Sequence, residues 1–206
     1  MRPITSYEQV SKINITSVED LLPVGQDWTI TKDIHRKIKK IVGRRTVLTK
    51  KEEDNIKGKI GEVFTKANLR KTLYKAGYME NMTGLRTFTL NYHYRGYVDF
   101  YLRFTNQFGE VYRCFIEVKN WKKWNYCTDK MFQRKILERF TKWDKDHKYH
   151  WILCINHRNL PVVEKYCKKY GILILPLREH YTKQLIRKIA NENRILNDVP
   201  VRYPNT

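Results

Sequence analysis

The 206-residue sequence has few acidic residues, with 21 Asp and Glu against 41 Lys and Arg, and its formal net charge is +20. It also has no apolar run of about 20 residues, the length needed to cross a bilayer. The longest apolar runs, at residues 151–155 and 172–177, have the length of strands. We therefore expect no membrane span. Because no apolar stretch follows Met1, we also expect no signal peptide and an intracellular location, in the host cytoplasm if the chain is viral.

The four cysteines form no CxxC pair and lie in or beside apolar segments, which predicts buried free thiols. One alternative is a zinc site made by His147, His150, Cys154 and His157. The same stretch has the composition of a strand, whose alternation would place Trp151 and Cys154 on opposite faces and separate the ligands. Zinc is the less favoured interpretation.

The glycine-rich motifs GxxxxGK[ST] and GxGxxG are missing too, so we expect no nucleotide cofactor. The sequence is nevertheless that of a folded protein, with 41% hydrophobic and 13% aromatic residues. A pI near 9.8 on such a chain indicates an anionic partner. Nucleic acid is the favoured partner, because each neutralised phosphate releases a counterion. The alternative is a charge that serves only solubility.

The hydrophobic period changes along the chain from helical to two-residue alternation and back. The expected elements are, in order, helices at 31–43 and 51–76, strands at 85–94, 97–105 and 111–119, a helix capped by Thr128 or Asp129, a strand at 151–155, a helix at 161–170, a strand at 172–175 and a helix at 182–194. The expected apolar stripe of the helix at 51–76 is Ile56, Ile60, Val63, Phe64, Ala67 and Leu69. That of the helix capped by Thr128 or Asp129 is Phe132, Ile136, Phe140 and Trp143. This order predicts an α/β fold around a mixed sheet. We expect one compact domain, with a basic, largely helical extension at 1–50, the core at 51–178, and a C-terminal helix and tail at 179–206.

The strands at 97–105 and 111–119 are joined by a three-residue loop that ends in Gly109, as such hairpin loops require. Centring the pairing on Phe108 gives an apolar face with the pairs Val98–Val118, Phe100–Ile116 and Leu102–Cys114. The opposite face then has the pairs Tyr97–Lys119, Asp99–Glu117 and Tyr101–Phe115.

This register places the carboxylates of Asp99 and Glu117 opposite each other, with Cβ atoms about 4.5–5.5 Å apart. Such a pair is destabilising unless a cation lies between its members. Together with the backbone carbonyl of Val118, the carboxylates offer three hard oxygen ligands for Mg²⁺ or Mn²⁺. Lys119 would lie beside the metal, where an ammonium orients water or stabilises transition-state charge. The alternative is an exposed, salt-bridged strand.

The sequence Val98-Asp99, followed by Glu117-Val118-Lys119 and preceded by a helix with Gly58-Lys59-Ile60-Gly61-Glu62, resembles the PD-(D/E)XK nuclease superfamily. It looks most like archaeal Holliday-junction resolvases and the small nucleases of hyperthermophilic archaeal viruses. The resemblance covers about residues 57–155 and implies a restriction-endonuclease-like αβββαβ core with a mixed central sheet flanked by helices.

The resemblance also implies a role for individual residues. The catalytic set would be Glu62, Asp99, Glu117 and Lys119, with Glu62 reaching the metal directly or through water. Gln133, on the following helix, would match an auxiliary polar residue of the family, and a plain surface residue is the alternative. Val98 stands where the family has a proline, and the separation of Asp99 from Glu117 is longer than in compact resolvases.

Two basic groups are candidates to bind DNA. The first lies in and between the two expected N-terminal helices and consists of Arg36, Lys39, Lys40, Arg44, Arg45 and Lys59. The second follows the strand that ends at Lys119 and consists of Trp121, Lys122, Lys123 and Trp124. Its lysines would hold phosphates and its tryptophans would stack on unpaired bases. Alternatively, the tryptophans cap the edge of the sheet.

Together these features predict a Mg²⁺-dependent endodeoxyribonuclease that hydrolyses phosphodiester bonds with metal-activated water. The family implies products with a 5′-phosphate and a 3′-hydroxyl. Branched or junction DNA is the favoured substrate, with duplex DNA and RNA left open. We expect a homodimer, because resolving a junction takes two symmetric cuts. The alternative is a non-catalytic nucleic-acid-binding protein built on a nuclease-like core.

Overall fold

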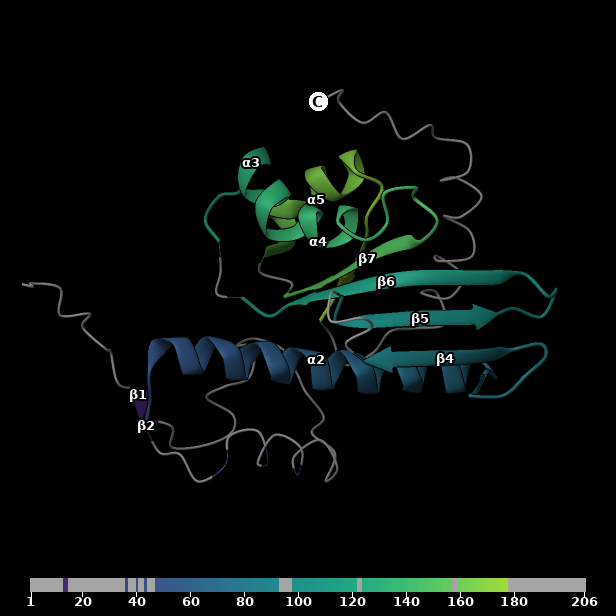
Figure 1. Ribbon diagram of the computed structural model, residues 1–206. Helices are drawn as coiled ribbons and strands as arrows, with labels where there is room; N and C mark the ends of the chain where they lie inside the picture. The colour runs from purple at the N-terminus through teal and green to yellow at the C-terminus, as the bar shows by residue number, and fades with distance from the viewer. Residues whose placement is uncertain are drawn as a thin grey trace, which may run out of the picture.

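The computed structural model describes residues 13–14, 36, 40, 43, 47–92, 98–121, 124–156 and 159–177. These residues form an α/β fold, in which helices cover both faces of a six-stranded mixed sheet (Figure 1). The predicted α/β class is therefore confirmed. Most of the helix expected at 31–43, and all of the helix expected at 182–194, lie outside the described residues. Among the described residues, no helix has the length and apolar character needed to span a membrane.

The strands of the sheet follow the chain order, β3-β4-β5-β6-β7-β8. They are β3 (Met79–Glu80), β4 (Thr87–Tyr92), β5 (Phe100–Thr105), β6 (Val111–Lys119), β7 (His150–Ile155) and β8 (Leu173–Pro176). The strands β4, β5 and β6 form an antiparallel meander, β7 and β8 continue parallel to β6, and β3 runs parallel to β4. A separate antiparallel pair joins β1 (Ile13–Asn14) to β2 (Val47–Leu48).

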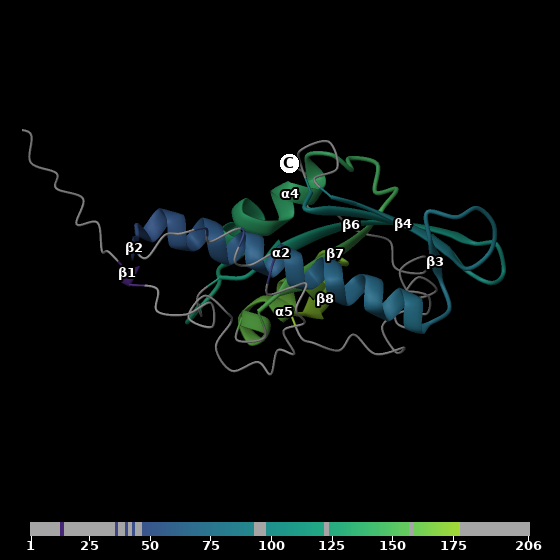
Figure 2. The same cartoon turned by 90° about the horizontal axis from the view of Figure 1, so that it is seen from below.

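The helices are α2 (Lys50–Lys75), α3 (Asp129–Phe132), the π-helical turn η3 (Gln133–Leu137), α4 (Glu138–Thr141) and α5 (Leu160–Lys169). The long helix α2 runs along one face of the sheet, and the others gather on the opposite face (Figures 1 and 2). All the elements expected between 51 and 175 are present, at nearly the expected positions. The two-residue strand β3 was not expected.

Helix α2 begins at a capping box, in which the Thr49 hydroxyl accepts from the Glu52 amide and the Glu52 carboxylate accepts from the Thr49 amide. It ends before Gly77, whose φ of +84° is readily adopted by glycine. Its buried side is made by Ile56, Ile60, Phe64, Leu69 and Leu73. This is largely the stripe expected from the sequence. It packs the helix onto the sheet and so fixes the position of the polar residues on its flank.

The hairpin between β5 and β6 has the predicted register, with Phe100 opposite Ile116 and Leu102 opposite Cys114. One expectation was wrong: Val98 does not share the face of Phe100, but packs in the cluster on the other side of the sheet. The reason is that β5 begins at Phe100, and Val98 lies in a bend before it, where strand alternation does not apply. The expected partner of Lys119, Tyr97, lies outside the described residues.

The helix after β6 is regular only at its two ends. Phe132, Ile136 and Phe140 are fully buried, as expected, but they are four residues apart, and the π-helical turn η3 accommodates this spacing. Trp143 was expected on the same buried stripe, but it is 37% exposed because α4 ends at Thr141. The turn matters for the site, because it changes which residues of α4 face the core.

All four cysteines are free and buried, as predicted. Trp151 and Cys154 pack in the clusters on opposite faces of the sheet, also as predicted. Of the possible zinc ligands, His157 lies outside the described residues. The other three are not part of any described group that could hold a metal ion.

Candidate metal centre

The site lies where the end of β6 meets the first half of α2. The helix approaches the strand closely at Gly61: a Cβ atom there would lie 2.8 Å from the Cβ of Asn120 and 3.3 Å from Cγ1 of Val118. Asn120 is buried, and its side-chain amide donates to the backbone carbonyl of Lys57 at 3.0 Å. Glycine at position 61 thus allows the contact that brings the neighbouring Glu62 to the end of β6.

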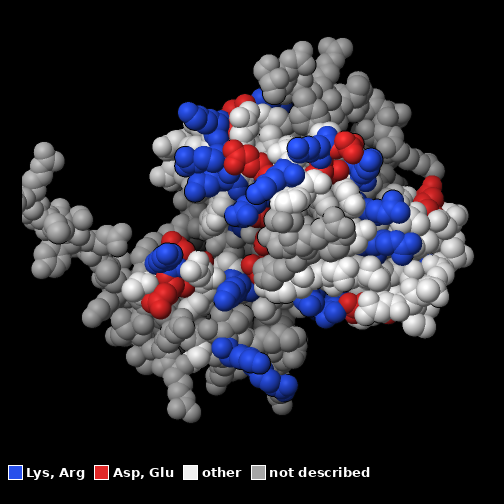
Figure 3. All heavy atoms as spheres, viewed as in Figure 1, with Lys and Arg blue, Asp and Glu red and all other residues white. Residues whose placement is uncertain are grey.

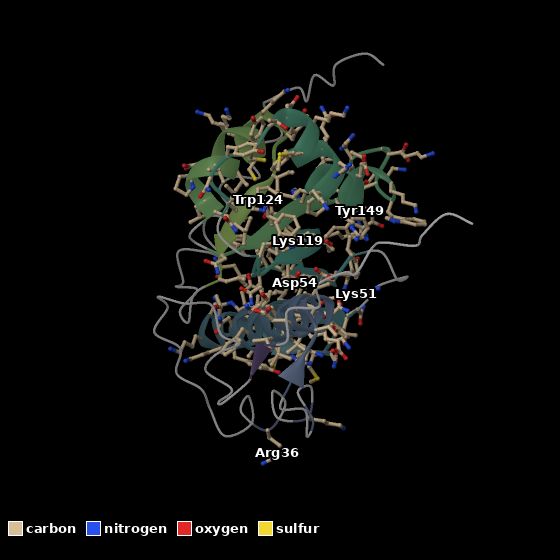
Figure 4. The ribbon with its side chains drawn as sticks, turned by 90° about the vertical axis from the view of Figure 1, so that its left-hand side faces the viewer. Arg36, Lys51, Asp54, Lys119, Trp124 and Tyr149 are labelled. Atoms are coloured by element: carbon tan, nitrogen blue, oxygen red, sulfur yellow. The ribbon has the colours of Figure 1, made fainter. Side chains whose placement is uncertain are left out.

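A pocket of about 470 Å³ lies at this junction. It is lined by Asp54, Asn55, Gly58, Lys59 and Glu62 of α2, by Val98, Asp99, Glu117, Val118 and Lys119 of the sheet and its preceding bend, and by Asn120, Trp121 and Arg139. Figure 4 shows Asp54 on α2 and Lys119 on the sheet, on two sides of this region. All four residues predicted to be catalytic therefore border one pocket.

Glu117 is the most buried of the charged residues in the pocket, with 2% of its surface exposed. Its Oε1 forms an ion pair with the Lys119 ammonium and lies 3.8 Å from Nε of Arg139. Its Oε2 is buried and has no hydrogen-bond partner among the described residues. Burial raises the pKa of Glu117 to about 7, with a smaller contribution from Asp99, while Lys119 and Arg139 oppose the shift. A buried carboxylate oxygen without a partner is the feature that a metal ligand would have.

Asp99 lies in the bend that precedes β5, one residue outside the ladder. Its Oδ2 accepts a hydrogen bond of 2.7 Å from the backbone amide of Val118. This bond holds the Asp99 carboxylate at the end of β6. Its negative charge contributes to the raised pKa of Glu117, so the two carboxylates are close enough to interact, although they are not a cross-strand pair.

Glu62 borders the same pocket, but its carboxylate accepts a hydrogen bond from the hydroxyl of Tyr92. Burial and this bond together raise the pKa of Tyr92. Among the described residues, no three His, Cys, Asp or Glu side chains form a group that could hold a metal ion. Hard divalent cations prefer carboxylate oxygens, and of the carboxylates that line the pocket, those of Asp99 and Glu117 are close enough to interact. Glu62 also lines the pocket.

Lys119 is largely buried, with 11% of its side chain exposed. Its ammonium lies between the Glu117 carboxylate and the ring of Trp121, whose centre is 5.3 Å away. Trp121 in turn stacks on Trp124, with ring centres 4.6 Å apart and planes at 24°. Both tryptophans are partly buried and pack against the cluster beneath α3 and α5. Both tryptophans therefore have packing contacts within the fold, and their stacking on unpaired bases stays a prediction.

The other predicted DNA-binding residues are placed unevenly. Lys59 lines the pocket, whereas Arg36 and Lys40 are exposed and do not line it. In Figure 4, Arg36 lies far from Lys119, beyond α2. Outside the described residues lie Lys39, Arg44, Arg45, Lys122 and Lys123. Gln133 does not line the pocket, and its amide donates to Asp129 at 3.3 Å and to the Tyr170 hydroxyl at 3.0 Å.

Sequence reasoning missed Arg139, which brings a second cation, from α4, to the same oxygen of Glu117 that pairs with Lys119. Two turns of an α-helix take about 7.2 residues, so in a regular helix Arg139 would share the buried side of Phe132. The π-helical turn gives that place to Phe140 and leaves the Arg139 side chain 59% exposed. The four-residue spacing of the buried residues also fits an ordinary α-helix, so it did not indicate the turn.

Arg139 belongs to a basic surface over α3 and α4, which Figure 3 shows as a group of Lys and Arg side chains with acidic residues among them. The exposed members are Lys130, Arg134, Lys135, Arg139 and Lys142. Of these residues, Arg139 alone lines the pocket.

Comparison of the chain with family models, with curated proteins and with solved structures found no match in any of the three.

Proposed function

We propose that the protein is a metal-dependent endodeoxyribonuclease of the PD-(D/E)XK type, with a restriction-endonuclease-like core. The order of α2, the β4–β6 meander, the α3–α4 helix and β7 supports this proposal, because it is the αβββαβ order expected of that core. The observation that carries it is the state of Glu117. A buried carboxylate beside Asp99, with one oxygen paired to Lys119 and the other without a partner among the described residues, is suited to complete its coordination with a cation.

Asp99 and Glu117, with the backbone carbonyl of Val118, would hold Mg²⁺ or Mn²⁺. When bound, the ion would supply Lewis-acid activation of water and of the phosphoryl oxygen. The protein's own residues position the groups that react. Val118 holds Asp99 in place through its amide, and Tyr92 holds Glu62 at the edge of the pocket, where the carboxylate can accept a proton of a bound water.

Lys119 places a donor between Glu117 and the pocket, where it can orient the attacking water and stabilise negative charge on a phosphate oxygen. Arg139 adds a second cation to the lining of the pocket, with the planar donors that suit phosphate. Water attack at phosphorus with departure of the 3′ oxygen would leave a 5′-phosphate and a 3′-hydroxyl. DNA is the proposed substrate, branched or duplex, and a homodimer is the proposed assembly for symmetric cleavage of a junction.

A non-catalytic nucleic-acid-binding protein is a second candidate. The ion pair between Lys119 and Glu117 favours it, because that pair partly compensates the buried charge without a metal. The two candidates differ in whether phosphodiester bonds are cut.

The test is to incubate the protein with linear, single-stranded, flap and four-way DNA, each with Mg²⁺, Mn²⁺ or Ca²⁺. The proposal expects cutting with Mg²⁺ or Mn²⁺ and binding without cutting with Ca²⁺. Binding of DNA without cutting under every condition would favour the second candidate.

A further inference from the structure

Gly58 lies in the interior of α2, nine residues into a 26-residue helix. Glycine weakens a helix at such a position relative to alanine, so its presence calls for a local reason. Three reasons are common: a positive φ, tight packing against another part of the protein, or the close approach of a bound ligand.

The first two reasons do not apply. Gly58 is not among the described residues with positive φ, and α2 is continuous through it. A Cβ atom at position 58 would have no described atom within 4 Å. Gly61, three residues later, is the opposite case, since a Cβ there would press on Asn120 at 2.8 Å. The fold therefore explains the glycine at 61 but not the glycine at 58.

Gly58 also occupies a particular place in the pocket. Asp54 and Glu62, four residues before and after it, line the pocket on the same side of α2, so Gly58 is the middle of that wall. Lys59 lies next to it, and Lys119 and Arg139 line the pocket elsewhere. The bare backbone thus shares the pocket with three cations, which can contact phosphates, and with four carboxylates, two of which, Asp99 and Glu117, are the proposed metal ligands.

We infer that a DNA strand crosses α2 at Gly58, with its sugar-phosphate backbone lying against the helix where the side chain is missing. This inference rests on the proposed function, since it takes DNA to be the substrate of the pocket. Lys59 would contact a phosphate beside the crossing, and the phosphate that reaches Asp99 and Glu117 would be the one to be cut. A methyl group at position 58 would occupy the space that the strand needs.

Gly58→Ala should make the protein more stable and its DNA binding weaker. Removing a mid-helix glycine should raise Tm by about 1–4 °C. The affinity for a labelled oligonucleotide should fall by about fivefold or more, and Gly58→Leu should weaken it further, because the added atoms overlap the strand. Binding is measured by fluorescence anisotropy in Ca²⁺, so that cleavage does not enter.

Ala67→Gly is the matched control. Position 67 is also in α2 and partly buried, but it does not line the pocket. The substitution should lower Tm by a similar amount and leave DNA affinity unchanged, which separates helix stability from strand contact.

The outcomes distinguish this inference from the proposed function. If the wild type binds DNA and Gly58→Leu binds it equally well, the strand does not cross here and the inference is wrong, whatever the cleavage assay gives. If the wild type binds DNA but cuts none with Mg²⁺ or Mn²⁺, the nuclease proposal fails, while weakened binding by the Gly58 variants would still support the crossing. A wild type that binds no DNA overturns both.

Discussion

The ammonium of Lys119 pairs with one oxygen of the Glu117 carboxylate, and the other oxygen of that carboxylate is buried without a hydrogen-bond partner among the described residues. The carboxylate is thus satisfied on one side only. Burial also raises the pKa of Glu117, because it disfavours the charged carboxylate more than Lys119 and Arg139 favour it.

The first prediction concerns stability and pH in the metal-free protein. The pKa of Glu117 is about 7 in the folded chain, against an ordinary value of 4.5, so the folded state binds the proton more tightly than the unfolded state. Stability contributed by this group should be present below pH 4.5 and be lost as the pH rises to about 7. The charged groups that face Glu117 are Lys119, Arg139 and Asp99. At pH 8 the ionised Glu117 carboxylate should lower the free energy of unfolding by about 1–3 kcal/mol.

Glu117→Gln removes this titration. The Tm of the variant minus that of the wild type, measured in a chelator, should therefore increase from pH 5 to pH 8. Glu164→Gln, at an exposed position of α5, is the control for the loss of a carboxylate outside the pocket. A pH-independent difference for Glu117→Gln would mean that the carboxylate is ionised throughout.

The second prediction concerns metal binding without DNA. A ligand that binds only the folded state raises Tm, by an amount set by its concentration relative to Kd. Mn²⁺ should raise the Tm of the wild type, and this rise should be lost in Asp99→Asn and in Glu117→Gln. Asp146→Asn, which removes an exposed carboxylate outside the pocket, should keep it. An equal rise in all four proteins would place the metal elsewhere.

The third prediction concerns the contact between α2 and β6. In Gly61→Ala the new methyl group would press on Asn120, so the helix must move away from the strand that carries Glu117 and Lys119. Overpacking of this kind costs about 1–3 kcal/mol. The variant should lose thermal stability, and its DNA cleavage should fall more than its DNA affinity. Adding Asn120→Gly to Gly61→Ala should restore part of the activity, because it removes the Cβ atom that the new methyl group would contact. If activity does not recover, the loss in Gly61→Ala has a cause other than this contact.

The fourth prediction concerns Arg139. Because its side chain is 59% exposed, Arg139→Ala should leave Tm almost unchanged. Loss of a phosphate-binding cation from the pocket should lower the cleavage rate by about 10- to 1000-fold. Arg134→Ala, on the same basic surface but outside the pocket, should change the rate little. Equal effects of the two substitutions would mean that Arg139 acts only through the positive charge of this surface and has no specific role in the pocket.

Much of this arrangement could be predicted from sequence because local rules determine it. The capping box at Thr49 and the stripe of apolar residues define α2, and the left-handed Gly109, with φ of +83°, fixes the register of the β5–β6 hairpin. That register places Glu117 and Lys119 of β6, and Asp99 just before β5, at one end of the sheet. All three line the pocket that the structure contains.

The rest depended on tertiary packing. The alternation of strand residues predicts that the β5–β6 pairing extends to Val98, but the pairing stops at Phe100. Asp99 is therefore held by a hydrogen bond from the Val118 amide and does not pair across the strands with Glu117. The π-helical turn cannot be distinguished by spacing from an ordinary helix with a drifting stripe, and Arg139 was missed for that reason. Tyr92, which holds Glu62, comes from a strand 30 residues away in sequence.

The central claim is that the pocket cuts DNA with a metal held by Asp99 and Glu117. The most direct measurement compares wild type, Asp99→Asn and Lys119→Ala in cleavage with Mg²⁺ and in DNA affinity with Ca²⁺. We expect cutting by the wild type alone, with Asp99→Asn binding DNA at least as tightly, because an anion near the phosphate has been removed. Cleavage by Asp99→Asn at the wild-type rate would contradict the account.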